Sequence, residues 1–230
     1  MAKLKSDDSN ESAENRSMSI KSFDIEKTSF KIIDDEIGDH SYDLQYEWPV
    51  VRRVIHATAD FEFATKEKII FNRDPISSAF NAFKNGCTIV TDVEMVRSGI
   101  SKTNLAKLNL NSVCRISDPA LMEEAKKHNK TRAEMAMLSC RKEMNKGIVI
   151  IGNAPTALYE IIRMIEENET MPSLVIGIPV GFVSALESKK ELLQINVPCI
   201  TNIGRKGGSS VAASIINALL LLYTHREHSI

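Results

Sequence analysis

The sequence predicts an α/β protein, a three-layer α/β/α sandwich around a five-stranded parallel sheet. After residue 146, a short apolar segment runs three times into a turn marked by glycine or proline and then into a helix with periodic apolar residues. Two earlier apolar segments are also followed by helical patterns. Strands that alternate with helices form parallel sheets with right-handed crossovers, so the carboxyl ends of the strands and the loops after them share one edge. Ligands bind at that edge in open sheets of this kind.

Three helices are expected before the first strand. Apolar residues recur at helical spacing over residues 24–37, which are followed by a glycine. The second helix covers residues 49–56 and starts with a proline, a residue favoured in a first helical turn. The third covers residues 75–85, between Asp74 as its N-cap and Gly86 as its C-terminal stop.

Short apolar segments bounded by turn residues predict the strands. The five predicted strands cover residues 87–91, 112–116, 147–152, 174–178 and 198–201. Between the second and the third, residues 119–145 have a helical pattern that breaks near residue 129, and a new helix starts at Thr131 because Glu134 completes a capping box. The last helix, from about residue 210 to residue 223, is too short for a membrane span, which needs ~20 apolar residues.

The composition restricts the class of partner. The chain of 230 residues has a net charge of -1, which gives no electrostatic footprint for nucleic acid or an anionic membrane, so a small molecule or another protein is the expected partner. Its four cysteines are far apart, without metal-ligand spacing, and are expected to be reduced thiols in the cytoplasm. Residues 1–19 are polar and predict a disordered leader ahead of a single domain over residues 20–230.

The three loops after residue 146 differ in chemistry. Residues 204–210 combine glycines, two cations and hydroxyls at a helix entrance, where N–H groups and Arg205 can hold phosphate or carboxylate, unless the glycines serve helix packing alone. Residues 153–156 place an amide and a hydroxyl at another helix start, which capping alone also explains. Residues 179–183 are apolar and are expected to face a partner subunit or an apolar ligand. Residues 189–191 have the charge pattern of a solvated helix face.

His56 is the histidine best suited to chemistry. It ends an apolar helix three residues after Arg53, so the two side chains share one helix face. A neighbouring guanidinium opposes protonation of the imidazole, which keeps it available as a base near neutral pH. A helix C-terminal histidine stabilised by the helix dipole is the alternative interpretation.

Taken together, the motifs closely resemble those of the precorrin-8X methylmutase family of corrinoid (vitamin B12) biosynthesis, also called precorrin isomerase or cobalt-precorrin-8 methylmutase, over about residues 25–220. The segments that carry the resemblance are Ser29-Phe30-Lys31-Ile32-Ile33, Arg53-Val54-Ile55-His56-Ala57-Thr58, Thr91-Asp92-Val93-Glu94-Met95-Val96, Thr131-Arg132, Gly152-Asn153-Ala154-Pro155-Thr156-Ala157-Leu158, Pro179-Val180-Gly181-Phe182-Val183, Glu187-Ser188-Lys189 and Gly204-Arg205-Lys206-Gly207-Gly208-Ser209.

The resemblance implies a flavodoxin-like fold, a homodimer with substrate near the subunit interface, and an isomerase that moves a methyl group between adjacent ring carbons of (cobalt-)precorrin-8 to give cobyrinate or hydrogenobyrinate. It also implies that His56 is the catalytic acid/base, that there is no cofactor or protein metal site, and that any cobalt belongs to the substrate. The matching positions imply substrate contacts by Ser29, Arg53, Thr58, Asp92, Met95, Arg132, Asn153, Ala154, Pro155, Thr156, Val180, Gly181, Phe182, Val183, Glu187, Ser188, Lys189, Gly204, Arg205, Lys206, Gly207, Gly208 and Ser209.

Two positions depart from the family pattern. Ile203 replaces a residue that is often basic, and Ser184 stands where a smaller residue is common.

Two alternative functions stay open. One is a non-catalytic corrinoid or tetrapyrrole carrier on the same fold, in which His56 only packs. The other is a nucleotide-dependent enzyme, which is disfavoured because neither the phosphate-loop nor the dinucleotide glycine fingerprint is present.

Overall fold

The computed structural model describes residues 24–227, so the predicted polar leader at residues 1–19 lies outside the described residues. The chain divides into two units, residues 1–40 and residues 41–230. The helices and strands named below all belong to the second unit, apart from one helix in the first.

That helix covers residues 24–37, as its apolar periodicity predicts. It ends at Gly38, whose φ of 63° is left-handed and whose N–H donates to the Asp34 carbonyl oxygen. Ser29 lies on this helix, and its hydroxyl donates to the Ile25 carbonyl oxygen at 2.9 Å.

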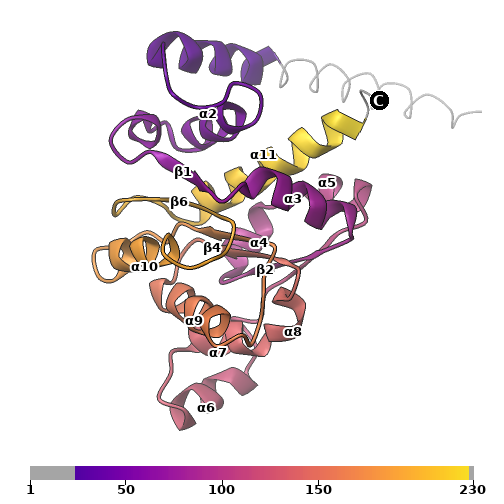
Figure 1. The fold of residues 1–230 in the computed structure, drawn as a ribbon, viewed down its shortest axis with the longest axis vertical. Helices are drawn as coiled ribbons and strands as arrows, with labels where there is room; N and C mark the ends of the chain where they lie inside the picture. Colours follow the sequence, from indigo (N-terminus) through magenta and orange to yellow (C-terminus); the bar gives the residue numbers. More distant parts are fainter. Residues whose placement is uncertain (1–23, 228–230) are drawn as a thin grey trace, which may run out of the picture. The chain divides into compact units, whose positions relative to one another are not determined.

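The second unit is built on a six-stranded sheet in the order β1-β6-β5-β4-β2-β3 (Figure 1). The strands are β1 (Ile69–Asn72), β2 (Thr88–Thr91), β3 (Asn111–Val113), β4 (Ile148–Ile151), β5 (Leu174–Gly177) and β6 (Cys199–Asn202). All pairs from β3 to β6 are parallel, and numbered along the chain these five strands have the order 2-1-3-4-5 of a flavodoxin-like doubly wound sheet. The five predicted strands are confirmed, although the second ends at Val113 instead of residue 116.

The predicted strand count of five is wrong because β1 is a sixth strand. β1 has four residues at the sheet edge and pairs antiparallel with β6, so it lies outside the repeated strand, loop and helix pattern that identifies the parallel strands. Its direction matters for the site. Ile69 pairs with Asn202 at the end of β6, so the residues just before β1 reach the edge at which the parallel strands end.

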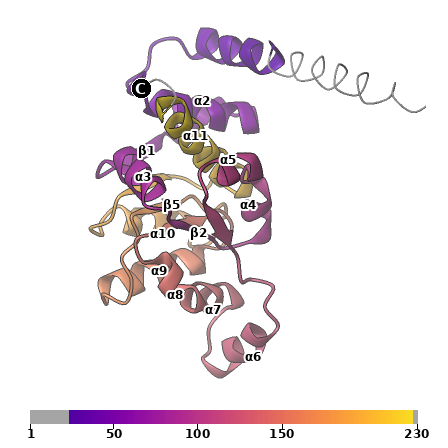
Figure 2. The same ribbon diagram turned by 90° about the vertical axis from the view of Figure 1, so that its right-hand side faces the viewer.

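Helices cover both faces of the sheet, as the predicted sandwich requires (Figures 1 and 2). On one face are α3 (Pro75–Lys84), α4 (Glu94–Gly99), α5 (Lys102–Lys107) and α11 (Ser209–Glu227), with α2 (Glu47–Thr58) packed against α11 and followed by the 3-10 helix η1 (Phe61–Ala64). On the other are α8 (Arg141–Met144), α9 (Pro155–Glu166) and α10 (Ala185–Leu192), with α7 (Arg132–Ser139) beside α9 and α6 (Ala120–Lys127) beside α7.

Local sequence signals explain several helix boundaries. The Asp74 carboxylate accepts from the Ser77 N–H, and Pro75 is the first residue of α3, as predicted. Thr131 and Glu134 form the predicted capping box at the start of α7. The helical pattern over residues 119–145 is broken a second time, at Cys140 between α7 and α8.

The core is apolar and lies on both sides of the central strands. All four residues of β4 are fully buried, and so are those of β5 and β6. Three of the cysteines are buried, Cys114 is partly buried, and all four are free thiols, as expected. Within residues 24–227, no helix is both long enough and apolar enough to cross a membrane.

Candidate functional site

The loops after β4, β5 and β6 meet at the start of α11. The Gly208 N–H donates to the Ile178 carbonyl oxygen at 3.0 Å, which joins the last two loops. Gly207 has a φ of 152°, and a Cβ there would lie 2.3 Å from the same oxygen, so only glycine permits this approach. A Cβ on Gly152 would lie 3.1 Å from the Ser209 Cα, which shows that the first loop also contacts this point. The prediction of one shared loop edge is confirmed.

Asp92, at the end of β2, holds the loop after β4. One carboxylate oxygen accepts from the Gly152 N–H at 3.1 Å, and the other accepts from the N–H groups of Asn153 and Ala154 at 2.7 and 2.8 Å. Burial raises the pKa of Asp92, and the three hydrogen bonds act against that rise. Its side chain is 0% exposed, so the direct substrate contact predicted for Asp92 has no accessible atom to make it.

Lys189 of α10 holds the loop after β6. Its ammonium donates to the Asn202 side-chain oxygen at 2.8 Å and to the carbonyl oxygens of Gly204 and Lys206 at 3.0 and 2.6 Å. The side chain is 0% exposed, and burial lowers the pKa of Lys189 to about 8. The solvated face predicted for residues 189–191 is therefore wrong at Lys189, and this ammonium is not open to a substrate. Lysine is usually exposed, but here three carbonyl oxygens accept from the ammonium and offset the cost of burying it.

Glu67, which the sequence analysis did not identify, binds the same loop from the other side. Its carboxylate accepts from the Asn202 side-chain amide and from the Lys206 N–H, both at 3.0 Å. The Lys206 ammonium contacts Asp60 and Glu62, each at 2.6 Å, and the hydrogen bond to Asp60 raises the pKa of Lys206. The substrate contact predicted for Lys206 therefore competes with two ion pairs inside the chain. The charged residues at 60–67 lie here because β1 starts beside the end of β6.

His56 lies at the C-terminal end of α2, with an exposed side chain at a pocket of about 280 Å³. Arg53 lines the same pocket, which confirms that the two residues share a helix face. The opposite wall comes from the first turns of α11. Its lining residues there are Ser210, Ala213, Ser214 and Asn217. The His56 imidazole thus lines the same pocket as Ser210 and Ser214, and Ser210 directly follows Ser209, near which the three loops meet.

Asn217 is a second residue that the sequence analysis missed. Its side chain accepts from the Ser101 N–H and donates to the Gly99 carbonyl oxygen, both at 2.8 Å, and it fixes the junction of α4 and α5 at the rim of the pocket. An asparagine within the otherwise apolar stretch of α11 was the available signal, because a polar residue in such a stretch usually has a specific partner.

The loop after β5 exposes apolar side chains, as its sequence predicts. Val180 is 46% exposed, Phe182 84% and Val183 81%. The guanidinium of Arg205 lies over the Phe182 ring, 5.5 Å from its centre. An apolar surface with a cation at its side is therefore present at this edge of the sheet.

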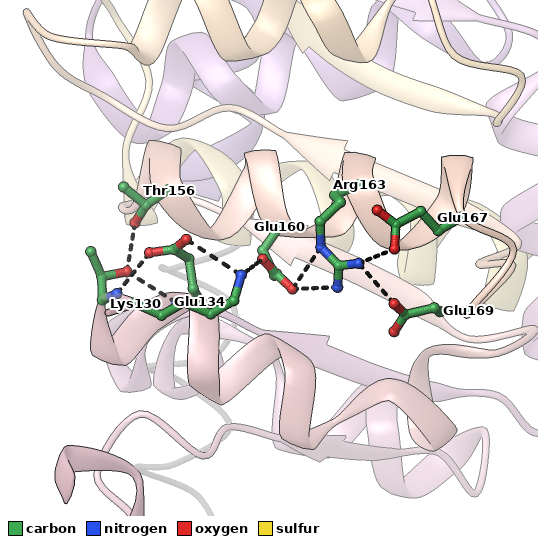
Figure 3. A network of polar contacts seen from close by, with 8 residues as sticks. Lys130, Glu134, Thr156, Glu160, Arg163, Glu167 and Glu169 are labelled. Atoms are coloured by element: carbon green, nitrogen blue, oxygen red, sulfur yellow. Dashed lines mark hydrogen bonds and ion pairs between the residues drawn. The ribbon is translucent and has the colours of Figure 1, made fainter. Parts of the chain in front are cut away.

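Thr156 and Arg132 lie at the adjoining helix starts. The Thr156 hydroxyl contacts that of Thr131 at 3.1 Å, and Arg132 next to it is exposed. Behind them a polar network links α7 to α9, with the buried Glu160 between Lys130 and Arg163 (Figure 3). Burial would raise the pKa of Glu160, but the hydrogen bonds from Arg163 and Lys130 outweigh it and lower that pKa. This network fixes the two helix starts relative to each other.

The remaining predicted contacts divide by exposure. Met95 is 74% exposed and Glu187 is exposed, whereas Ser188 is fully buried and donates to the Ala185 carbonyl oxygen. The half-buried Thr58 donates to the Val54 carbonyl oxygen. The predicted contacts by Ser188 and by the backbone-bonded Thr58 hydroxyl thus have little or no free polar surface.

The His56 pocket differs from the other pockets described here by its histidine and not by its volume. A hollow of about 710 Å³ lies between α6 and α7 and includes Arg132, and another of about 450 Å³ lies around Arg141 and Met171. Neither contains a histidine. Within residues 24–227, no group of three or more His, Cys, Asp or Glu side chains is arranged to hold a metal ion.

The fold and the sheet edge define a class, a doubly wound α/β protein with a histidine-containing pocket beside its strand-end loops. The family model for precorrin-8X methylmutase matches residues 24–222. The chain is 49% identical to the cobalt-precorrin-8 methylmutase of Priestia megaterium, over 86% of this chain and 87% of that protein. It is 45% identical to the cobalt-precorrin-8 methylmutase of Leptospira interrogans, over 88% and 94%. A crystal structure of precorrin-8X methylmutase from Thermus thermophilus superimposes with a TM-score of 0.81 at 37% identity, over 88% of this chain and 96% of that one.

This chain belongs to the precorrin-8X methylmutase family. It is therefore an isomerase of cobalamin biosynthesis, as the sequence resemblance implies.

Proposed function

We propose that the protein catalyses the intramolecular migration of a methyl group between adjacent ring carbons of cobalt-precorrin-8, with His56 as the acid/base. The observation that carries the assignment of His56 is its position. Its exposed imidazole opens into the pocket beside the start of α11, next to the edge at which three loops meet. The names of the two curated relatives support a cobalt-containing substrate. In this proposal the cobalt is part of the substrate, and the protein uses no cofactor.

The proposed role of His56 is to protonate the macrocycle beside the migrating methyl group and to take the proton back afterwards. Protonation draws electron density away from the ring carbon, which makes the shift of the methyl group to its neighbour easier. A positioned acid/base contributes ~10²- to 10⁴-fold in rate. The remaining acceleration has to come from holding the rigid macrocycle in one orientation.

The sheet edge has the chemistry that a corrin precursor needs. Such a molecule is a broad apolar disc with carboxylates at its rim, so it requires an apolar wall and surrounding cations. Val180, Phe182 and Val183 supply an exposed apolar wall. Arg132 and Arg205 are exposed, so we assign the carboxylates to these side chains and not to the internally bonded Lys189 and Lys206.

We also propose that the active form is a homodimer. The His56 pocket of about 280 Å³ is slightly below the range of about 300–1,000 Å³ for small-molecule sites and too small to enclose a macrocycle. A second copy of the chain that docks beside the exposed apolar residues Val180, Phe182, Val183 and Ile203 would enclose the macrocycle against them. Ser29 is assigned as a substrate contact by family resemblance. A cytoplasmic location is likewise part of this proposal.

The test of His56 is turnover measured from the visible spectrum of the precursor. We expect His56→Ala to lose at least about 100-fold in turnover while it keeps its affinity for the product. His128→Ala is the matched control, because His128 is also an exposed histidine at the end of a helix, but it follows α6 and does not line the His56 pocket. Normal turnover by His56→Ala would refute the acid/base role, and binding without turnover by the wild-type protein would favour the corrinoid carrier.

The choice of substrate is tested by a paired assay with the cobalt-containing and the metal-free precursor. We expect a higher kcat/KM with the cobalt-containing one. The reverse preference would contradict that part of the proposal without touching the role of His56.

A further inference from the structure

The topological switch point of the doubly wound sheet, where open sheets of this kind have a ligand crevice, lies between β2 and β4. From β2 the chain continues to β3 on one side, and from β4 it continues to β5 on the other side. In sheets of this topology, such a crevice at the carboxyl ends of the strands binds ligands, and N–H groups at the start of the following helix hold an anion, most often phosphate. Two helices begin at this point, α4 (Glu94–Gly99) after β2 and α9 after β4, and α9 begins at Pro155 after the loop at residues 152–154.

The N–H groups of this loop are already occupied. All three point to the Asp92 carboxylate, at 2.7 to 3.1 Å. The Asp92 N–H in turn donates to the Ile150 carbonyl oxygen, which fixes Asp92 to β4. Because it accepts from all three N–H groups and is 0% exposed, the carboxylate occupies the place that an external anion would need in order to bind them.

The loop depends on Asp92 for its shape. Ala154, the N-cap residue of α9, has no side-chain hydrogen bond to cap the helix, and its own N–H donates to the Asp92 carboxylate, which follows a different strand. Gly152 is packed tightly, since a Cβ there would lie 2.7 Å from a Val96 methyl group and 3.0 Å from the Ala212 Cβ. The loop therefore cannot move toward α4 or α11 to find other partners. Its outward groups are the exposed Asn153 side chain and the half-buried Thr156 hydroxyl.

We propose that Asp92 is a positioning and specificity residue, a built-in anion that fixes residues 152–154 for the substrate and excludes phosphate from the crevice. The ligand class that the edge accepts is one whose acidic groups lie outside this crevice, such as a polycarboxylate, and not a nucleotide or a flavin nucleotide. The positioning half of the inference rests on the proposed function, and the exclusion of phosphate does not.

The exclusion of phosphate is tested by binding. In Asp92→Ala the three N–H groups lose their acceptor, and we expect formate and inorganic phosphate to bind there and to raise the midpoint of thermal unfolding in a saturable way. The wild-type protein should not respond. Asp74→Ala is the matched control, because Asp74 also caps a helix start, but it follows the antiparallel β1 and so lies at the opposite edge of the sheet. A folded Asp92→Ala protein that binds neither anion would overturn the inference.

The positioning role is tested by activity. We expect Asp92→Ala to lose at least about tenfold in kcat/KM, since small misplacements of positioning groups cost up to about 100-fold. Formate should restore most of this loss, whereas the neutral formamide should not. Unchanged kcat/KM without formate, or equal effects of formate and formamide, would contradict the role. Loss of activity in every variant and in the wild-type protein would instead count against the proposed function, while the anion-binding result would stand by itself.

Asp92→Asn keeps the test decisive if Asp92→Ala does not fold. Its side chain has the same shape but places an NH2 group against at least one backbone N–H. We expect a lower kcat/KM that formate cannot restore, because the amide fills the anion position. An Asp92→Asn protein with wild-type kcat/KM would show that the charge of Asp92 is not required.

Discussion

Replacing Lys189 with methionine tests whether this buried ammonium shapes the loop after β6. Methionine keeps the length and apolar character of the side chain but removes the three hydrogen bonds to Asn202, Gly204 and Lys206. The Lys206 carbonyl oxygen keeps a hydrogen bond from the Asn202 side-chain amide at 3.2 Å, so two acceptors lose their donor. Each buried acceptor left without a donor costs about 1–3 kcal/mol, or roughly 4 kcal/mol for two. The variant also no longer buries an ammonium, and this gain in stability offsets part of the loss.

The lowered pKa of Lys189 measures the free-energy cost of burying its ammonium, a cost that the methionine variant no longer has. Burial lowers this pKa from 10.5 to about 8, and a difference of this size corresponds to about 3 kcal/mol. We therefore expect Lys189→Met to lose about 1 kcal/mol of unfolding free energy at pH 7, which for a chain of this size is a fall of roughly 2–4 °C in Tm. Lys190→Met is the control, because Lys190 is exposed on the same helix and should change Tm little.

The two proteins should also differ in how their stability changes with pH. Between pH of about 8 and 10.5 the folded state binds fewer protons at Lys189 than the unfolded state, so wild-type stability rises with pH over this window by comparison with Lys189→Met. Differential scanning calorimetry of both proteins at pH 7 and pH 10 measures this. The reasoning is refuted if the two proteins have equal Tm at pH 7, or if their difference in Tm is the same at both pH values.

The remaining predictions concern backbone conformation and the loop edge. Gly207→Ala should lose more than about 1 kcal/mol of stability and raise KM, because its Cβ would approach the Ile178 carbonyl oxygen; a thermal scan and steady-state kinetics check this, and unchanged values would contradict the packing at this edge. Ser184→Gly should gain about 0.5–1 kcal/mol, because Ser184 has a left-handed φ of 64°, and a loss measured by urea unfolding would contradict that. Thr131→Ala should cost about 1 kcal/mol through the lost cap of α7, whereas a neutral change in Tm would show that the network at Glu160 alone holds this helix start.

The sequence predicted the parallel sheet because each of its strands is followed by a turn and a helix. The strand Ile69–Asn72 has no such context, and its pairing depends on a partner more than 120 residues later in the chain, so only the folded structure reveals it. The capping signals at Asp74 and Thr131 were reliable because they depend on residues within one helical turn.

The sequence predicted which residues lie near the candidate site, but not what each side chain contacts there. The exposed apolar residues near Phe182 and the shared helix face of Arg53 and His56 follow from local pattern, and the structure agrees with both. Asp92 and Lys189 were expected to contact the substrate, yet both are buried and bind backbone groups. Sequence patterns identify a polar residue near a loop, but whether its side chain turns inward depends on carbonyl and N–H groups that are distant in the chain.

The antiparallel direction of β1 also has a consequence for folding. It brings Glu67 to a loop that lies 135 residues further along the chain at Asn202 and 139 residues further at Lys206. Contacts of such long sequence separation form only after much of the chain has been ordered. The loop after β6 therefore takes its final shape late in folding, once the segment from Asp60 to the end of β1 has docked against the parallel sheet, and activity should return after the secondary structure does.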